Sequence, residues 1–254
     1  MEKFIRYAAF YGLLAAIVGI VMLMSSGTEV SADITNSAAV RSPKTINDTL
    51  EGWQYKYNIA PQGEGIYWAN YDYNLPAPQV KVAVNAMNQA ATRLAKSGMA
   101  FNVTLVFAKP LPLDDFKAFV SNTGISPSVS YIQAIASDGQ LAEASIPPSK
   151  KDIADGKALA GSEPLDSKLI NAIQTRQNNP LKVLGVVTTD VTLTAETYAK
   201  IIANGNVYAF DVTPYLITQR VEREYPDAKP EKIQVARSLL YNAMQRAGIA
   251  PKGK

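Results

Sequence analysis

The stretch Phe101–Val120, FNVTLVFAKPLPLDDFKAFV, decides the fold of this chain. Residues 101–107 alternate apolar and polar side chains, which predicts a strand. Proline cannot donate a ladder hydrogen bond, so Pro110 and Pro112 predict that this strand ends at Ala108. A helix follows directly, and the strand and helix together open a β-α-β unit.

Two adjacent carboxylates, Asp114 and Asp115, stand at the start of that helix. The apolar residues Leu113, Phe116 and Val120 keep helical spacing and form its inward stripe. The carboxylates therefore lie on the solvent side of the first turn, beside free backbone N–H groups and the positive end of the helix dipole. We interpret the pair as a helix start and not as an active site.

A second β-α-β unit is predicted further along the chain. The first unit closes with a strand at 129–135, and the second has a strand at 182–188, a helix at 194–203 and a strand at 207–212. Two such units predict an α/β (α+β) sandwich with helices on one face of a mixed sheet, similar to ferredoxin-like folds. The side chains of the second helix expected to face the sheet are Ala195, Tyr198, Ile201 and Ile202.

Further elements precede these units within a predicted domain of residues 51–254. Alternating aromatic and polar residues predict strands at 53–57 and 66–73, joined by a loop at 61–65. An apolar stripe at helical spacing predicts a helix at 78–96.

The remaining segments of the domain are polar or helical. Residues 137–180 are polar and rich in turn-forming residues, which predicts a surface insertion with one helix at 165–177. The tail, residues 213–254, is predicted to be helical, with Thr213 as a natural N-cap and a second helix beginning at Pro230.

The N-terminal segment has the properties of a membrane anchor. Residues 7–24, YAAFYGLLAAIVGIVMLM, carry no charge. As a helix they would span roughly 27 Å, close to the thickness of a bilayer core. Lys3 and Arg6 favour a cytoplasmic N-terminus. We expect residues 1–24 to form a cytoplasmic stub and an uncleaved transmembrane signal anchor, and residues 25–50 to form a flexible tether.

The alternative for this segment is a cleaved signal peptide. Val30-Ser31-Ala32 fits the small-x-small cleavage pattern, and cleavage after Ala32 would release a secreted protein. Under either hypothesis the following domain is extracytoplasmic. With an intact anchor, the lipid bilayer is its first expected partner, through residues 7–24.

The chain has no cysteine and no histidine. This composition excludes disulfides, thiolate nucleophiles, Ser-His-Asp and Cys-His catalysis, and ordinary catalytic zinc. The net charge is only +3, and no Lys/Arg block is interleaved with aromatic residues, so we expect no nucleic-acid partner. We expect no catalytic residue, no metal site and no cofactor.

A glycosidase needs only two carboxylates, so catalysis without histidine stays open. Asp211 is the most distinctive carboxylate because it lies in an apolar strand. The competing interpretation is that the strand ends there and that Asp211 supports the turn into the next helix. The carboxylate candidates are Glu64, Asp72, Asp114, Asp115, Glu196 and Asp211.

A dense cluster of Tyr and Trp residues covers the first two predicted strands of the domain. Such side chains stack on sugars and anchor interfaces, so one face of the strands is a candidate binding platform. The alternative is that the aromatic residues form cross-strand pairs that stabilise a hairpin. The candidate binding residues are Trp53, Tyr55, Tyr57, Tyr67, Trp68, Tyr71 and Tyr73.

Three motifs resemble a known family. The helix start Lys109-Pro-Leu-Pro-Leu-Asp-Asp-Phe116, the strand Gly185-Val-Val-Thr-Thr189 and the strand Val207-Tyr-Ala-Phe-Asp-Val212 resemble the extracytoplasmic C-terminal domain of membrane-anchored sigma-factor regulators (anti-sigma-type proteins). The resemblance covers residues 101–135 and 182–212. It implies an α/β outer domain without catalytic residues. It carries no sigma binding onto this chain, which has six residues before the apolar segment.

The sequence therefore predicts a non-enzymatic, single-pass membrane protein. Its extracytoplasmic α/β domain would bind or sense something, or serve as a subunit of an envelope membrane complex with a protein partner. The alternative is a carboxylate-dependent enzyme acting on a cell-envelope polysaccharide, with the aromatic strands as its sugar platform.

Overall fold

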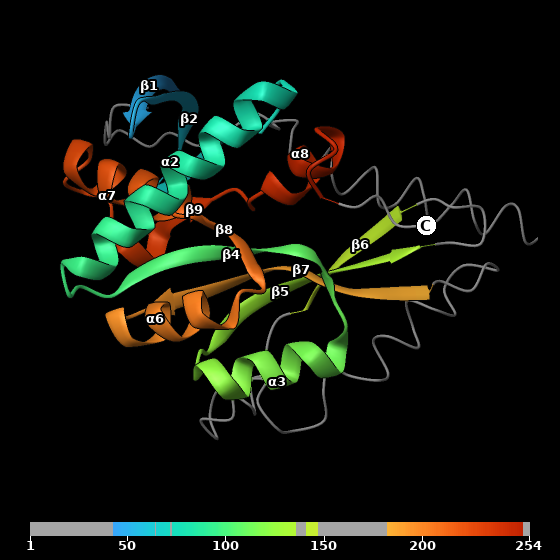
Figure 1. Ribbon diagram of the computed structural model, residues 1–254. Helices are drawn as coiled ribbons and strands as arrows, with labels where there is room; N and C mark the ends of the chain where they lie inside the picture. The colour runs from blue at the N-terminus through green and yellow to red at the C-terminus, as the bar shows by residue number, and fades with distance from the viewer. Residues whose placement is uncertain (1–42, 64, 72, 136–140, 147–181, 251–254) are drawn as a thin grey trace, which may run out of the picture. The chain divides into compact units, whose positions relative to one another are not determined.

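The computed structural model describes residues 43–63, 65–71, 73–135, 141–146 and 182–250. Within these residues the chain forms two sheets and five α-helices, which confirms a mixed α/β fold (Figure 1). The sequence predicted one mixed sheet. The structure has two, because the aromatic strands near residue 60 build a sheet of their own.

The five-stranded sheet contains both predicted β-α-β units. Its strands are β4 (Phe101–Leu111), β5 (Pro127–Ile135), β6 (Leu141–Ile146), β7 (Lys182–Leu193) and β8 (Val207–Asp211). Their spatial order is β6-β5-β7-β4-β8, and all neighbouring pairs are antiparallel. Each unit therefore has a strand of the other unit inserted between its own two strands, which is a split β-α-β arrangement.

The crossover helices α3 (Leu113–Thr123) and α6 (Ala195–Asn204) pack on one face of this sheet (Figure 1). The ring of Phe107 on β4 meets Phe116 and Phe119 of α3 edge-on, with ring centres 6.0 and 5.3 Å apart. On α6, Ile201 is buried, as predicted.

Two other side chains of α6 do not face the sheet as predicted. Ala195 is exposed, and Ile202 keeps 54% of its surface exposed. Ile201 is the buried residue of this helix, and its contacts are shared among α2, α3, β7 and β8.

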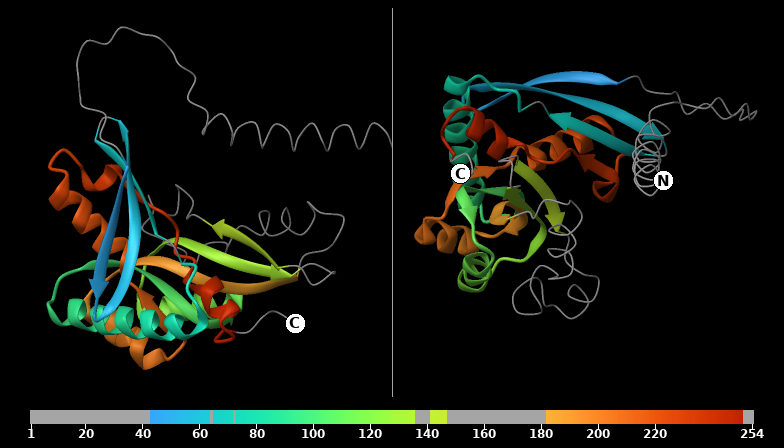
Figure 2. Two further views of the ribbon diagram at one scale, coloured as in Figure 1. Left: turned by 90° about the horizontal axis from the view of Figure 1, so that it is seen from above. Right: turned by 90° about the vertical axis from the view of Figure 1, so that its right-hand side faces the viewer.

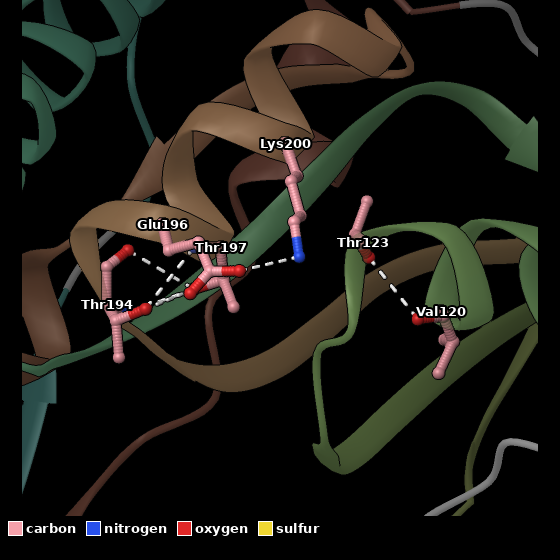
Figure 3. Close-up of polar contacts among 6 residues, drawn as sticks. All are labelled: Val120, Thr123, Thr194, Glu196, Thr197 and Lys200. Atoms are coloured by element: carbon pink, nitrogen blue, oxygen red, sulfur yellow. Dashed lines mark hydrogen bonds and ion pairs between the residues drawn. The ribbon is translucent and has the colours of Figure 1, made fainter.

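The start of α6 is fixed by its own side chains (Figure 3). The Thr194 hydroxyl accepts the Thr197 N–H at 3.3 Å, and the Thr197 hydroxyl accepts the Thr194 N–H at 2.9 Å, which forms a capping box. Glu196, which lies between Thr194 and Thr197 in the sequence, forms a surface ion pair with Lys200 at 2.8 Å.

The four-stranded sheet has the order β1-β2-β3-β9. Its members are β1 (Lys44–Leu50), β2 (Trp53–Gly63), β3 (Ile66–Tyr71) and β9 (Ile233–Val235). The first three strands are antiparallel, and β9 is parallel to β3. The loop predicted at 61–65 begins later, because β2 continues to Gly63.

Two predictions about the ends of the domain are wrong at this sheet. Residues 44–50 were assigned to the tether, yet they form β1, because Ile46 and Leu50 are buried against β2. The long helix predicted from Pro230 is instead a 3-10 turn, then β9, then a short helix. Pairing with β3 supplies backbone hydrogen bonds that favour the strand at Ile233–Val235.

Strand β4 continues past Pro110, although the sequence predicted its end at Ala108. The ladder is interrupted by a register shift and resumes where Leu111 pairs with Val186. A bulge is a place where a strand tolerates proline. Gly185 makes the close approach possible: a Cβ there would lie 2.2 Å from the Leu111 carbonyl oxygen, at a φ of +141°.

Helices α2 (Ala77–Lys96), α7 (Thr213–Glu224) and α8 (Leu240–Arg246) lie on the other side of the five-stranded sheet. Figure 2 shows α7 between the sheets. It contacts β4, and Tyr225 at its end packs on Tyr67 of β3 with ring centres 4.6 Å apart. The predicted helix at 78–96 is confirmed as α2.

Thr213 does not cap α7 as predicted. Val212 is the N-cap residue, and the Thr213 N–H is bound instead by the carboxylate of Asp211 at 2.9 Å. This confirms the interpretation of Asp211 as support for the turn into the helix.

Two further predictions concern segments that the structure covers only in part. Residues 141–146, assigned to the surface insertion, form β6 and pair with β5. The helix expected at 165–177 and the apolar segment 7–24 lie outside the described residues. Among the helices of the described part, none is both long and apolar enough to cross a bilayer.

Candidate ligand-binding site

Three polar residues form one row across the five-stranded sheet. Thr104 of β4 lies directly opposite Asp190 of β7 on one side and Asp211 of β8 on the other. Residues opposite one another across neighbouring strands point to the same face of a sheet. This is the face away from Phe107 and α3, so the row points toward α7 and the segment that follows β9.

Asp211 is completely enclosed at one end of the row. Its Oδ2 accepts hydrogen bonds from the hydroxyls of Tyr73 and Ser238, the latter at 2.6 Å, and its Oδ1 accepts the Thr213 N–H. Burial next to this charge raises the pKa of Tyr73 well above its usual range. A buried carboxylate with three donors ties together β8, α7 and the two segments that carry Tyr73 and Ser238.

Asp190 at the other end of the row is only half enclosed, and it lines a cavity of about 420 Å3. The cavity lies over β4, β5 and β7, and it is bounded by the start of α7 and by residues 235–238, which connect β9 to α8. Its polar lining residues are Asn102, Thr104, Ser128, Tyr131, Asp190, Thr192, Arg237 and Ser238.

The Asp190 carboxylate has one oxygen engaged and one free. Its Oδ1 accepts the hydroxyl of Thr104 at 2.5 Å. Within the described residues, no protein group binds its Oδ2. Burial raises the pKa of the Asp190 carboxyl above its usual 3.8; the Thr104 hydrogen bond and the Arg237 charge oppose this rise, and the Asp211 charge adds to it.

Arg237 supplies the positive charge of the cavity. Its guanidinium carbon lies 4.1 Å from the centre of the Tyr131 ring, which is a cation–π contact. Both side chains line the same cavity as Asp190, so a carboxylate from the sheet and a guanidinium from the connection after β9 meet in one site.

The predicted aromatic platform is not an open surface in this structure. Five of the rings, Trp53, Tyr55, Tyr57, Tyr67 and Tyr71, share one face of the four-stranded sheet and pack on neighbouring aromatic rings, with Trp53 stacked on Tyr55 at 5.0 Å. Of the seven residues, only Trp68 is exposed, at 41%. The side chains that are no more than 8% exposed are Trp53, Tyr55, Tyr57, Tyr67, Tyr71 and Tyr73. These positions support the alternative of hairpin-stabilising aromatic pairs.

The four carboxylate candidates that lie within the described residues are not gathered at one site. Asp114, Asp115 and Glu196 lie in the first turns of α3 and α6, and the Asp114 side chain is 93% exposed. Asp211 is enclosed, and Glu64 and Asp72 lie outside the described residues.

Sequence reasoning missed Asp190. The strand was predicted to end at Thr188, which left Asp190 outside it, whereas β7 runs to Leu193. The available signal was the continuing run Val191-Thr-Leu193, which would have placed Asp190 in a strand with apolar neighbours. Asp211 was recognised by that same pattern.

Among the described residues, no three Asp or Glu side chains come close enough together to hold a metal ion. The chain matches no family model, no curated protein and no solved structure.

Proposed function

We propose that this chain is a membrane-anchored, non-enzymatic module that binds a small polar molecule outside the cytoplasm. The observation that carries the proposal is the cavity over β4, β5 and β7, which both Asp190 and Arg237 line and where one carboxylate oxygen of Asp190 has no hydrogen-bond partner among the described residues. Concave sites with a few fixed polar groups are the usual form of small-ligand sites, and the volume of about 420 Å3 suits a small molecule.

The geometry favours binding over two-carboxylate catalysis. Among the described residues that line the cavity, Asp190 is the one carboxylate. Its neighbour in the row, Asp211, is fully buried and bound to three donors, so it has no access to a ligand. A glycosidase needs both carboxyl groups in contact with the sugar or its attacking water.

The membrane part of the proposal rests on the sequence. Residues 7–24 are uncharged and of bilayer length, with Lys3 and Arg6 before them, so we propose an N-terminal anchor with the domain outside. The resemblance to the outer domains of anti-sigma-type regulators is compatible with sensing. A protein partner in an envelope complex would receive the signal or hold the module in place.

Ligand binding is tested first by native mass spectrometry of the full-length chain purified from its own membranes. We expect a bound molecule of small mass that is lost in Asp190→Asn and kept in Asp115→Asn, a change on the exposed side of α3. An empty protein that also fails to bind any member of a polar metabolite library would contradict the proposal.

The anchor is tested by N-terminal sequencing and by extraction of membranes with alkaline carbonate. We expect Met1 or Glu2 as the first residue, retention in the carbonate pellet, and digestion of the domain by protease added from outside. A mature protein that begins at Asp33 would establish the cleaved signal peptide instead. Crosslinking in native membranes, followed by pull-down, should recover a fixed protein partner.

A further inference from the structure

The four-stranded sheet has a second face, which points away from the buried aromatic rings. Successive side chains of a strand point to opposite faces, so the residues between the buried rings of β2 and β3 point outward. Helix α7, whose end packs on Tyr67, lies on the side of the rings (Figure 2). We call the other side the outer face, and its exposed aromatic and amide residues are Asn47, Gln54, Asn58, Trp68, Asn70 and Gln234.

Trp68 is the aromatic residue of the outer face within the described part of the sheet. It keeps 41% of its surface exposed, and its ring contacts no other aromatic ring of the described residues. Ala60 and Gln234 lie opposite it on the two neighbouring strands, and the methyl group of Ala60 is too small to cover the ring. An accessible tryptophan ring on a sheet is a flat apolar surface on which the C–H face of a sugar can stack.

The polar groups next to Trp68 are side-chain amides with unused hydrogen-bonding atoms. Asn70 follows Trp68 by two residues on the same face, and Asn58 lies opposite Asn70. Among the described residues the amides of Asn70 and Gln234 have no partner, and that of Asn58 only accepts the Thr45 hydroxyl at 2.6 Å. An amide donates and accepts hydrogen bonds, as a sugar hydroxyl does, so the two kinds of group satisfy each other.

A hollow of about 330 Å3 lies beside the other end of this row, on β1 and β2. The hollow contains one negative and one positive side chain, so its lining carries no net charge and favours a neutral ligand. From Gln54 to Ala60, which lies opposite Trp68, β2 runs over roughly 20 Å, so a ligand that contacts both ends is extended. The lining residues of the hollow are Asn47, Asp48, Thr49, Gln54, Tyr55 and Lys56.

We infer that the outer face binds a neutral oligosaccharide. One sugar unit stacks on the Trp68 ring, the amides of Asn58, Asn70 and Gln234 bind its hydroxyls, and the units that follow lie along β2 toward the hollow. This site lies on the other sheet from Asp190, so the inference does not depend on a small molecule in the cavity.

The test uses the fluorescence of the two tryptophans of the chain. Trp53 is only 4% exposed, so quenching by acrylamide reports Trp68. The full-length chain is purified in a detergent without a sugar head group and titrated with cellohexaose, maltohexaose and the hexamer of N-acetylglucosamine. We expect at least one of these probes to protect Trp68 from acrylamide. Absence of binding by all of them would overturn the inference and leave the proposal for the cavity standing.

Variants locate the bound sugar by isothermal titration calorimetry with the tightest probe. Trp68→Ala should weaken binding at least tenfold, as expected for a tryptophan at the centre of a binding face, whereas Trp68→Phe should keep most of it. Asn70→Ala should weaken binding by a smaller factor, because it removes hydrogen bonds but leaves the ring. Wild-type affinity in Trp68→Ala would overturn the assignment to the outer face.

Two further variants are matched controls. Tyr208→Ala removes an aromatic ring of similar exposure, 36%, on β8 of the other sheet, and Asp190→Asn alters the cavity. Both should bind the probe as the wild type does. Loss of binding in Asp190→Asn would place the sugar in the cavity and overturn the site on the outer face.

Two last measurements separate a neutral sugar from other occupants of the outer face. An acidic oligosaccharide, a hexamer of galacturonic acid, should bind more weakly than the neutral probe at low salt. Tighter binding that falls with added salt would show that the charge of Lys56 dominates and would overturn the neutral class. Protection of Trp68 that grows with protein concentration in the absence of sugar would show that a second copy covers the face.

Discussion

The two sheets use the same alternation of side chains for opposite purposes. In the four-stranded sheet, alternate residues of β2 place Trp53, Tyr55 and Tyr57 on one face, where they pack as core. In the five-stranded sheet, the face toward α7 carries Asp190 and Asp211 in one row. The first face is rich in aromatic residues and is buried, whereas the second, on which only Asp211 stood out in the sequence, borders a cavity at Asp190.

This difference shows why a buried carboxylate is better evidence of a ligand site than a cluster of buried aromatic rings. Burying an aromatic ring is favourable in itself, so a cluster of rings needs no ligand to explain it. Burying a carboxylate is costly unless donors surround it. Asp211 has such donors, whereas one oxygen of Asp190 has none among the described residues, and a ligand would complete its environment.

The largest effect on stability is expected from removing a ring on the buried aromatic face of the four-stranded sheet. Tyr57→Ala should lower the free energy of unfolding by about 4 kcal/mol, because the side chain is 1% exposed and would leave a cavity. Tyr57→Phe should be close to neutral, since the buried hydroxyl has no hydrogen-bond partner in the described part of the chain. Urea denaturation measures both, with Trp68→Ala as the exposed control. Equal losses for Tyr57→Ala and Trp68→Ala would contradict the core assignment.

Removing the buried carboxylate of Asp211 should lower the free energy of unfolding somewhat less than Tyr57→Ala does. Asp211→Ala leaves the hydroxyls of Tyr73 and Ser238 and the Thr213 N–H without their acceptor, so the free energy of unfolding should fall by about 3 kcal/mol. The same urea titrations apply, with Asp114→Ala on the surface of α3 as the matched change. A loss no greater than that of Asp114→Ala would show that Asp211 does not tie these segments together.

A smaller effect is expected at the outer edge of the five-stranded sheet. Asn88 of α2 donates to the Tyr208 carbonyl at 3.1 Å and accepts the Phe210 N–H at 2.9 Å, so its amide substitutes for a neighbouring strand. Asn88→Ala should cost about 1.5 kcal/mol and speed hydrogen exchange of the Phe210 amide. Asn122→Ala, on the exposed side of α3, should change neither the stability nor the exchange rate of the Phe210 amide. If that amide still exchanges slowly in Asn88→Ala, Asn88 does not protect the edge of the sheet.

The smallest effect on stability is expected at Asp190, the member of the row that lines the cavity, and it depends on pH. The pKa of Asp190 is raised in the folded protein, so the folded state holds this proton more tightly than the unfolded chain, and ionisation costs stability. The free energy of unfolding of Asp190→Asn should therefore rise relative to that of the wild type as the pH increases from 3.8, the ordinary pKa of the carboxyl, to its raised pKa in the folded protein. Above that pH the difference between the two proteins should stay constant.

The charged or titratable groups around Asp190 are Asp211 on β8, Arg237 after β9 and Tyr131 on β5. Urea midpoints of the wild type and of Asp190→Asn between pH 3 and pH 8 provide the comparison, with Asp114→Asn as the surface control. A relative stability that falls with rising pH would show that the ionised Asp190 is stabilised in the fold, contrary to its raised pKa.

Much of the fold could be predicted because it depends on local patterns. The apolar stripe of α2, the strand-helix-strand order around α3 and the helix α6 all follow from residues that are close together in the sequence. The errors occur where distant pairing overrides local preference. β1 and β9 depend on β2 and β3 as partners, and β4 passes Pro110 because Gly185 lets two backbones meet.

The candidate site could not be predicted in the same way. Its two charges come from positions 190 and 237, which no local pattern connects. Asp190 was missed because the strand was predicted to end at Thr188, and Arg237 was placed in a long helix, whereas the structure has a non-helical connection between β9 and α8 at that position.

The sequence by itself determined the exclusion of cysteine and histidine chemistry, the apolar N-terminal segment, the two β-α-β units and the role of Asp114 and Asp115 as a helix start. Only the tertiary structure decided that the aromatic strands are core, that Asp211 is sealed and that Asp190 faces a cavity beside Arg237. The reason is physical: periodicity reports which side chains share a face of one element. Whether that face is covered depends on elements far away in the chain.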